Sequence, residues 1–129
     1  MLTRDAILSA DDLRTLVVSV PEWGGDVTVR ELTGTERDEY ESSVVRTDGD
    51  KVSVDARDMR AKLVVMSVVD EDGKRLFTVQ DVKALGAKSA KALDRIMDVA
   101  RSLSGIGNEA LEAKGKDLPE TTSGDSLST

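Results

Sequence analysis

Two runs of alternating apolar and polar residues near the start of the chain predict a pair of β-strands. The first run covers residues 16–20 and the second covers residues 27–30, and in each of them every second residue is aliphatic. Pro21 and the pair Gly24-Gly25 lie between the runs and predict a turn, so Trp23 is expected in the loop that joins the two strands. The aliphatic residues expected to share one face of each strand are Leu16, Val18, Val20, Val27 and Val29.

A polar helix is predicted directly after the second strand. Residues 33–36 read Thr-Gly-Thr-Glu, which is the spacing of a capping box between Thr33 and Glu36. The helix that this box begins is mostly charged, and Tyr40 and Val44, one helical turn apart, are its main apolar pair. We therefore expect the helix to pack through a narrow stripe.

The middle of the chain predicts a break, a helix and a turn. Residues 47–51 are polar and include a glycine, which favours a flexible break. From Val54 onward the apolar residues recur at helical spacing, although the valine-rich part at residues 64–69 is also compatible with a buried strand. Residues 70–74, Asp-Glu-Asp-Gly-Lys, predict a tight turn.

Two further helices are predicted before residue 105. Thr78 is the expected N-cap of a short helix that ends at Gly86. A longer helix is expected to open near Ser89 and to end at Gly105, because glycine favours the left-handed conformation that closes helices. The apolar stripe of this longer helix comprises Leu93, Ile96, Met97, Ala100 and Leu103.

Together these elements predict one α+β domain, residues 1–105, in which a small antiparallel β-hairpin unit packs on a mostly helical body. One or two helical turns capped by Thr3 are expected ahead of the hairpin. Residues 106–129 are mostly small, polar or acidic and cannot bury enough apolar surface to offset the entropy of ordering them. We expect them to form a disordered, flexible acidic tail.

Composition argues against an enzyme. The chain contains no cysteine and no histidine, which removes thiolate chemistry, the commonest general base and the commonest transition-metal ligand. Both Asp-Gly turns fail as calcium loops, because the EF-hand register places Val44 or Val68 at the first ligand position. We expect no catalytic residue, no cofactor and no metal.

Charge and hydropathy limit the partners. The formal net charge of −7 disfavours nucleic acid, because phosphate binding needs clustered lysine and arginine. No apolar run approaches the ~20 residues that span a bilayer, and the N-terminus does not read as a signal peptide, so no membrane partner is expected. The helices at residues 78–103 carry a basic stripe that superficially suggests a helix-turn-helix, but the overall acidity favours a packed pair with solvated cations.

The segment VPEWGGDVTVRELTGTERDEYE resembles the tail assembly chaperones of long-tailed, siphovirus-type bacteriophages. Shorter similarities follow in the same order along the chain, at residues 63–69, 70–78, 85–88 and 103–105. Together they cover most of the chain between residues 17 and 105.

The resemblance implies a non-enzymatic assembly factor. Such chaperones bind the tape measure protein, keep it soluble and recruit tail tube subunits, so the implied partners are the tape measure protein and the tail tube protein, with self-association along the client. The implied location is the cytoplasm of the infected bacterial host, with absence from the mature virion. Two alternatives remain open: a minor structural tail or neck protein retained in the virion, and an acidic antitoxin-like regulator that uses the helices at residues 78–103.

Exposure and the scarcity of aromatic residues select the candidate partner-binding residues, and the resemblance does not mark them. Trp23 is the only tryptophan, and its loop is expected either to contact a partner or to fold back over its own sheet. The full set of candidates is Trp23, Glu22, Val17, Thr28, Arg30 and Tyr40.

The resemblance also generates a prediction about the gene. The family often makes a longer product by ribosomal frameshifting near the end of the coding sequence, and residues 114–116, Lys-Gly-Lys, are compatible with a slippery heptamer G-GGA-AAR that ends at Lys116. Sequencing the codons for these residues tests this, and any non-slippery codon there contradicts it.

Overall fold

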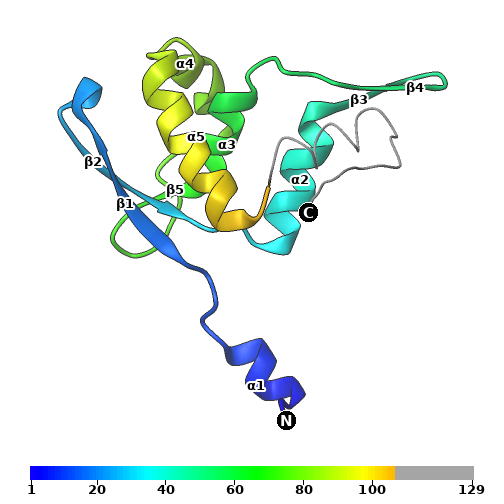
Figure 1. The fold of residues 1–129 in the computed structure, drawn as a ribbon, viewed down its shortest axis with the longest axis vertical. Coiled ribbons are helices and arrows are strands. Elements are labelled where there is room, and N and C mark those ends of the chain that lie inside the picture. The colour runs from blue at the N-terminus through cyan, green and yellow to red at the C-terminus, as the bar shows by residue number, and fades with distance from the viewer. Residues whose placement is uncertain (107–129) are drawn as a thin grey trace, which may run out of the picture.

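The computed structural model describes residues 1–106 of the chain (Figure 1). The expected acidic tail, apart from its first residue, and the Lys-Gly-Lys segment lie outside the described residues. Figure 1 shows the main sheet on one side of the body, a group of helices in the middle and one further helix, α2, on the other side. The predicted α+β class is confirmed.

The predicted strand pair forms two strands of a three-stranded antiparallel sheet. Strand β1 (Thr15–Val20) pairs with β2 (Gly25–Arg30), and β2 pairs in turn with the two-residue strand β5 (Val68–Val69). The turn between β1 and β2 is a short 3-10 helix, Pro21–Trp23. Val18, Val20 and Val29 are buried on the inner face as expected, but Leu16, on the edge strand β1, stays 51% exposed.

Helix α2 (Gly34–Val44) begins with the predicted capping box. Thr33 Oγ1 accepts a hydrogen bond from the Glu36 backbone N–H at 3.1 Å, and the Thr33 N–H donates to Glu36 Oε1 at 2.9 Å. Tyr40 and Val44 are fully buried and form the narrow apolar stripe. This stripe faces helix α3 (Met59–Ser67).

A second hairpin occupies the region where the sequence predicted a flexible break. Strands β3 (Val45–Asp48) and β4 (Lys51–Val54) pair in register and project from the body beyond α2 (Figure 1). The two residues between them include Gly49 with φ +63°, a conformation that suits the tight turns of hairpins. The prediction of a break was therefore wrong, because residues 51–54 alternate polar residues with valine and pair with residues 45–48, directly after α2.

The valine-rich segment forms both of the predicted structures, a helix in its first part and a buried strand in its last part. Helix α3 covers Met59–Ser67, and the chain then passes directly into β5. The buried Ser67 hydroxyl is satisfied by donating to the Leu63 carbonyl at 2.7 Å. The predicted turn at residues 70–74 follows, with the Gly73 N–H donating to the Asp70 carbonyl at 3.0 Å.

The two predicted C-terminal helices are also confirmed. A 3-10 turn (Val79–Asp81) leads into the short helix α4 (Val82–Gly86). Helix α5 (Ala90–Ser104) begins at Ser89, whose side chain accepts from the Ala92 N–H, and ends at Gly105 in the left-handed conformation. Helices α4 and α5 both pack against α3, so α3 holds the body together.

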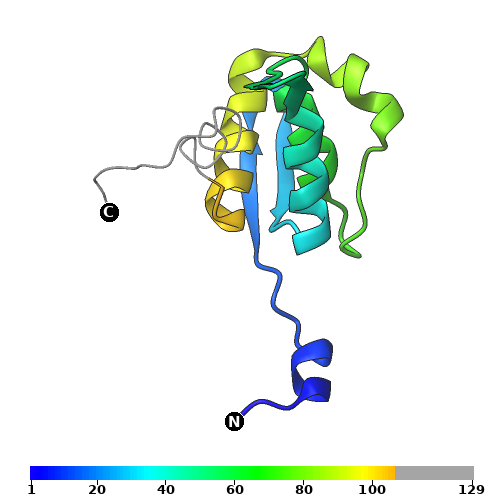
Figure 2. The same cartoon turned by 90° about the vertical axis from the view of Figure 1, so that its right-hand side faces the viewer.

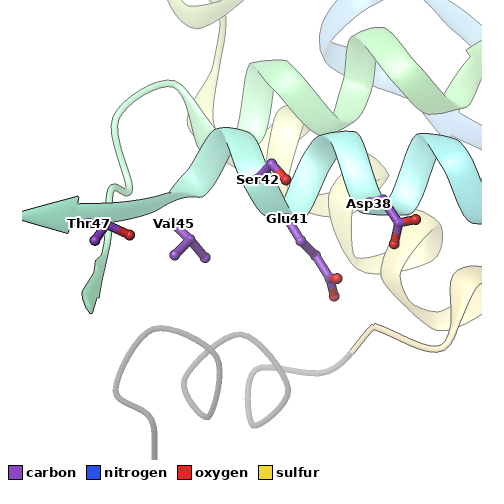
Figure 3. A pocket seen from close by; sticks show the side chains of 5 residues that line it. All are labelled: Asp38, Glu41, Ser42, Val45 and Thr47. Atoms are coloured by element: carbon purple, nitrogen blue, oxygen red, sulfur yellow. The ribbon is translucent and has the colours of Figure 1, made fainter. Parts of the chain in front are cut away.

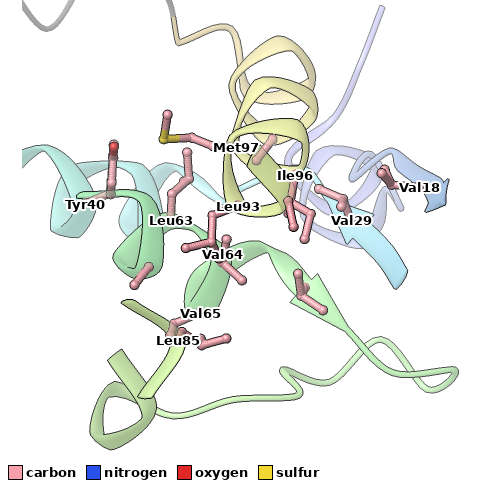
Figure 4. Packing of buried hydrophobic residues seen from close by; sticks show 14 of the residues in the cluster. Val18, Val29, Tyr40, Leu63, Val64, Val65, Leu85, Leu93, Ile96 and Met97 are labelled. Atoms are coloured by element: carbon pink, nitrogen blue, oxygen red, sulfur yellow. The ribbon is translucent and has the colours of Figure 1, made fainter. Parts of the chain in front are cut away.

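The core lies between the inner face of the sheet and helices α3 and α5. Figure 4 shows Val29 of β2 facing Ile96 of α5, with Leu63 and Leu93 filling the space toward α2. Figure 2, turned by 90°, shows α5 and α2 on either side of the strands seen behind them. The burial of aliphatic side chains supplies the main driving force for this fold.

Helix α1 (Arg4–Ser9) stands apart from the body at the end of an extended segment (Figure 1). Thr3 caps it as predicted, because its side chain accepts from the Ala6 N–H at 3.2 Å. The helix buries none of its residues. Its apolar residues therefore contribute no packing to the domain.

The tip of the first hairpin is tied to helix α5 by an ion pair. Arg95 donates to the two carboxylate oxygens of Glu22 at 2.7 and 2.9 Å. These hydrogen bonds lower the pKa of Glu22 from 4.5 to about 2. Beside this pair, Trp23 is partly buried and packs against the core.

The Glu22–Arg95 ion pair predicts an acid-dependent contribution to stability. A depressed carboxyl pKa stabilises the fold fully above the unfolded value of about 4.5, and this contribution disappears as the pH falls toward about 2. We expect Glu22→Gln to lower the Tm at neutral pH and the difference from the unmutated protein to shrink on acidification. A Tm difference that does not change with pH would contradict this.

The packing of Trp23 predicts that Trp23→Ala destabilises the domain. A fully buried aromatic residue costs about 3–5 kcal/mol on truncation, and a partly buried one is expected to cost roughly 2 kcal/mol. Urea unfolding measures this loss, with Trp23→Phe as the milder control. An unchanged free energy of unfolding would show that the indole adds nothing to the core.

Candidate functional site

The outer face of the three-stranded sheet, opposite the helices, is the candidate site. The register places Val17 of β1 opposite Thr28 of β2, and Thr28 opposite Val69 of β5, so these three side chains form one row across this face. Val17 is 63% exposed. Two of the predicted site residues, Val17 and Thr28, are therefore direct neighbours in the sheet.

The loop at residues 70–77 borders this face on the side of β5, along the strand edge that β2 does not occupy. Arg75 bridges back to Val69, and the Leu76 N–H donates to the Val68 carbonyl at 3.1 Å. Asp70 holds the turn, because its Oδ1 accepts backbone N–H groups from Asp72 at 2.8 Å and Lys74 at 3.0 Å. Leu76 remains 53% exposed beside the row.

A groove of about 510 Å³ lies between strand β2 and this loop. Its apolar lining comes from strands β2 and β5 and from the loop, and most of the remaining lining residues are acidic. Within the described chain, the carboxylates of Asp26, Glu71 and Asp72 take part in no hydrogen bond or ion pair. We call this the outer-sheet groove; its lining residues are Asp26, Val27, Thr28, Val69, Asp70, Glu71, Asp72 and Leu76.

An ion cluster closes one end of the outer face and holds the predicted site residue Arg30. Arg30 Nη2 donates to both carboxylate oxygens of Glu36 at 2.9 Å, and Arg75 Nη2 donates to Glu36 Oε2 at 2.7 Å. Burial raises the pKa of Glu36, but the Thr33 N–H and the two arginines outweigh it and hold that pKa below its ordinary value. Arg30 thus lies on the predicted face, with its charge already paired.

The other three predicted site residues lie elsewhere. Glu22 and Trp23 sit at the hairpin tip, where one pairs with Arg95 and the other packs against the core. Tyr40 was selected as an exposed anchor, and that premise is wrong: its side chain is fully buried in the helical layer (Figure 4). Burial raises the pKa of its hydroxyl, which the nearby Arg101 partly opposes.

Sequence reasoning missed two exposed features. Helix α1 presents Ile7 and Leu8, which are 55% and 68% exposed. Strand β1 pairs with β2 alone, so its other edge carries no strand within the described part of the chain. The helix itself was predicted, but nothing in its six residues shows that it stands apart from the body, and a free edge depends on the order of strands in space.

A second hollow, of about 470 Å³, runs along the outer side of α2 and the start of β3 (Figure 3). Its lining includes Asp38, Glu41, Ser42, Val45 and Thr47.

The described residues contain no group of three or more acidic side chains placed to hold a metal ion. Among them there is also no helix long and apolar enough to cross a membrane.

Comparison with known proteins agrees with the resemblance seen in the sequence. The model of the family described as phage tail assembly chaperone matches residues 3–116. The solved structure of the bacteriophage HK97 tail assembly chaperone is similar in fold, with a TM-score of 0.55 and 22% identity over 77% of this chain and 94% of that chain. No curated protein matched this chain. Because the family match spans most of its length, this protein belongs to the phage tail assembly chaperone family.

Proposed function

We propose that this protein binds the tape measure protein of its phage, keeps it soluble and recruits tail tube subunits while the tail is built. The observation that carries the proposal is an exposed, partly apolar sheet face, bordered by acids, on a domain whose own core is already complete. Exposed apolar patches on small soluble domains commonly mark protein-binding sites. The net charge of −7 would help to keep a complex with an apolar client in solution.

The protein would act in the cytoplasm of the infected host and would leave before the virion matures. Several copies are proposed to associate along one client, which would give avidity from weak single contacts. The uncovered apolar residues of α1 and the free edge of β1 support such association. No catalytic step, cofactor or metal is part of this proposal.

Co-expression with the neighbouring tape measure gene tests the proposal. We expect the tape measure protein to become soluble and to co-purify with this protein, because its apolar stripes are covered until the tube encloses them. The control is co-expression with an unrelated acidic domain of similar size. An insoluble tape measure protein with no co-purifying complex would contradict the proposal.

Mass spectrometry of purified virions separates the chaperone from a structural tail or neck protein. The chaperone role predicts that peptides of this protein are absent or far below the level of any tail subunit. Peptides in stoichiometric amount would instead show that the protein is retained in the particle.

A further inference from the structure

We infer that the outer-sheet groove binds an amphipathic helix whose apolar stripe is flanked by lysine or arginine. This inference rests on the proposed function, since it names the kind of client segment that the exposed face would take. It is carried by the architecture of the sheet, by the pairing of its backbone and by the charges around the groove.

The arrangement of the described elements leaves the outer face of the sheet without a helix against it. Helix α5 packs on β1 and β2 across the inner face, whereas among residues 1–106 no helix packs on the outer face, and the loop at residues 70–77 borders that face beside β5. Sheets bury an apolar face against another layer, and a helix is the common partner. A client helix laid between β2 and the loop would complete a helix–sheet–helix arrangement around Val69 and Thr28.

The backbone groups around the groove are already paired, which favours a helical ligand over a ligand that adds a strand to the sheet. Strand β2 is central, with β1 on one side and β5 on the other, so it offers no free edge inside the groove. The loop also pairs its own backbone, through Asp70 with Lys74 and through Leu76 with Val68. A ligand must therefore bind through side chains, and a helix suits this because it satisfies its own backbone groups.

The charges around the groove determine which charge on the ligand is favoured. Asp26 stands on the β2 side while Glu71 and Asp72 stand on the loop, and all three are exposed and unpaired within the described residues. Arg30 and Arg75 share the single carboxylate of Glu36, which offsets one of their two positive charges. Lys74 adds a further positive charge on the loop. The four carboxylates that line the groove, those of Asp26, Asp70, Glu71 and Asp72, outnumber these remaining cations, so the net field at the groove favours a cationic flank.

The test uses a synthetic peptide of about 18 residues, or about five helical turns, with a leucine stripe flanked by lysine. The groove variant is Asp26→Lys with Asp72→Lys, and the matched control is Glu39→Lys with Asp98→Lys on exposed positions of α2 and α5. Both double variants change the net charge from −7 to −3, since each substitution adds two positive units. Leu76→Ser is a third variant that removes exposed apolar surface and should leave the fold intact.

Fluorescence anisotropy of the labelled peptide measures its Kd. We expect the groove variant and Leu76→Ser to weaken binding by at least about tenfold and about threefold respectively, and the control to stay within about twofold. Replacing lysine by glutamate in the peptide should abolish binding. Equal weakening in the groove and control variants, or no binding by the unmutated protein, would overturn the inference.

The same variants separate this inference from the proposed function. If the groove variant still solubilises and co-purifies the tape measure protein, the client binds elsewhere: the chaperone function stands and the groove inference falls. If the unmutated protein binds the lysine peptide in the groove but never the tape measure protein, the proposed function fails and the groove remains a helix-binding site. Loss of both interactions in the groove variant alone supports both proposals.

Discussion

The direct passage of helix α3 into strand β5 is the constraint on which the rest of the structure depends. Leu63, Val64 and Val65 are consecutive and all buried, so α3 must be covered on several sides at once. Helices α2, α4 and α5 supply that cover. The residue directly after the helix, Val68, already belongs to the strand beside β2. The helical layer and the sheet therefore cannot move apart without breaking either the core or the sheet.

Ion pairs connect the same elements at the surface of the core. The Glu22–Arg95 pair holds the hairpin tip to α5, while Glu36 joins β2 to the start of α2 and, through Arg75, to the loop after β5. Glu36 is well shielded, and its bonds to two guanidinium groups and one backbone N–H balance the cost of burying its charge. This cluster therefore ties the loop that borders the groove to β2 and α2.

Local signals in the sequence predicted most of the elements, because turn glycines, capping residues and periodic apolar positions act over a few residues. The capping box at Thr33 and the stripe of α5 are examples. Signals that depend on assembly in space were missed: the β3–β4 hairpin looked like a flexible break, and Tyr40 was selected as a binding candidate although the stripe that it forms with Val44 is buried. Strand alternation predicted that Val17 and Thr28 point outward. It could not predict that they lie near the loop at residues 70–77, because that depends on β5 pairing with β2.

The inner face of the sheet packs against the helices, and we propose that the outer face binds the client. Hydrogen–deuterium exchange of the chaperone alone and in complex with the tape measure protein tests this division most directly, because it reports which backbone segments a client covers. We expect slower exchange at residues 70–77 and at the neighbouring strands, with exchange in α2 and the β3–β4 hairpin unchanged. Protection confined to α2 and that hairpin would contradict it.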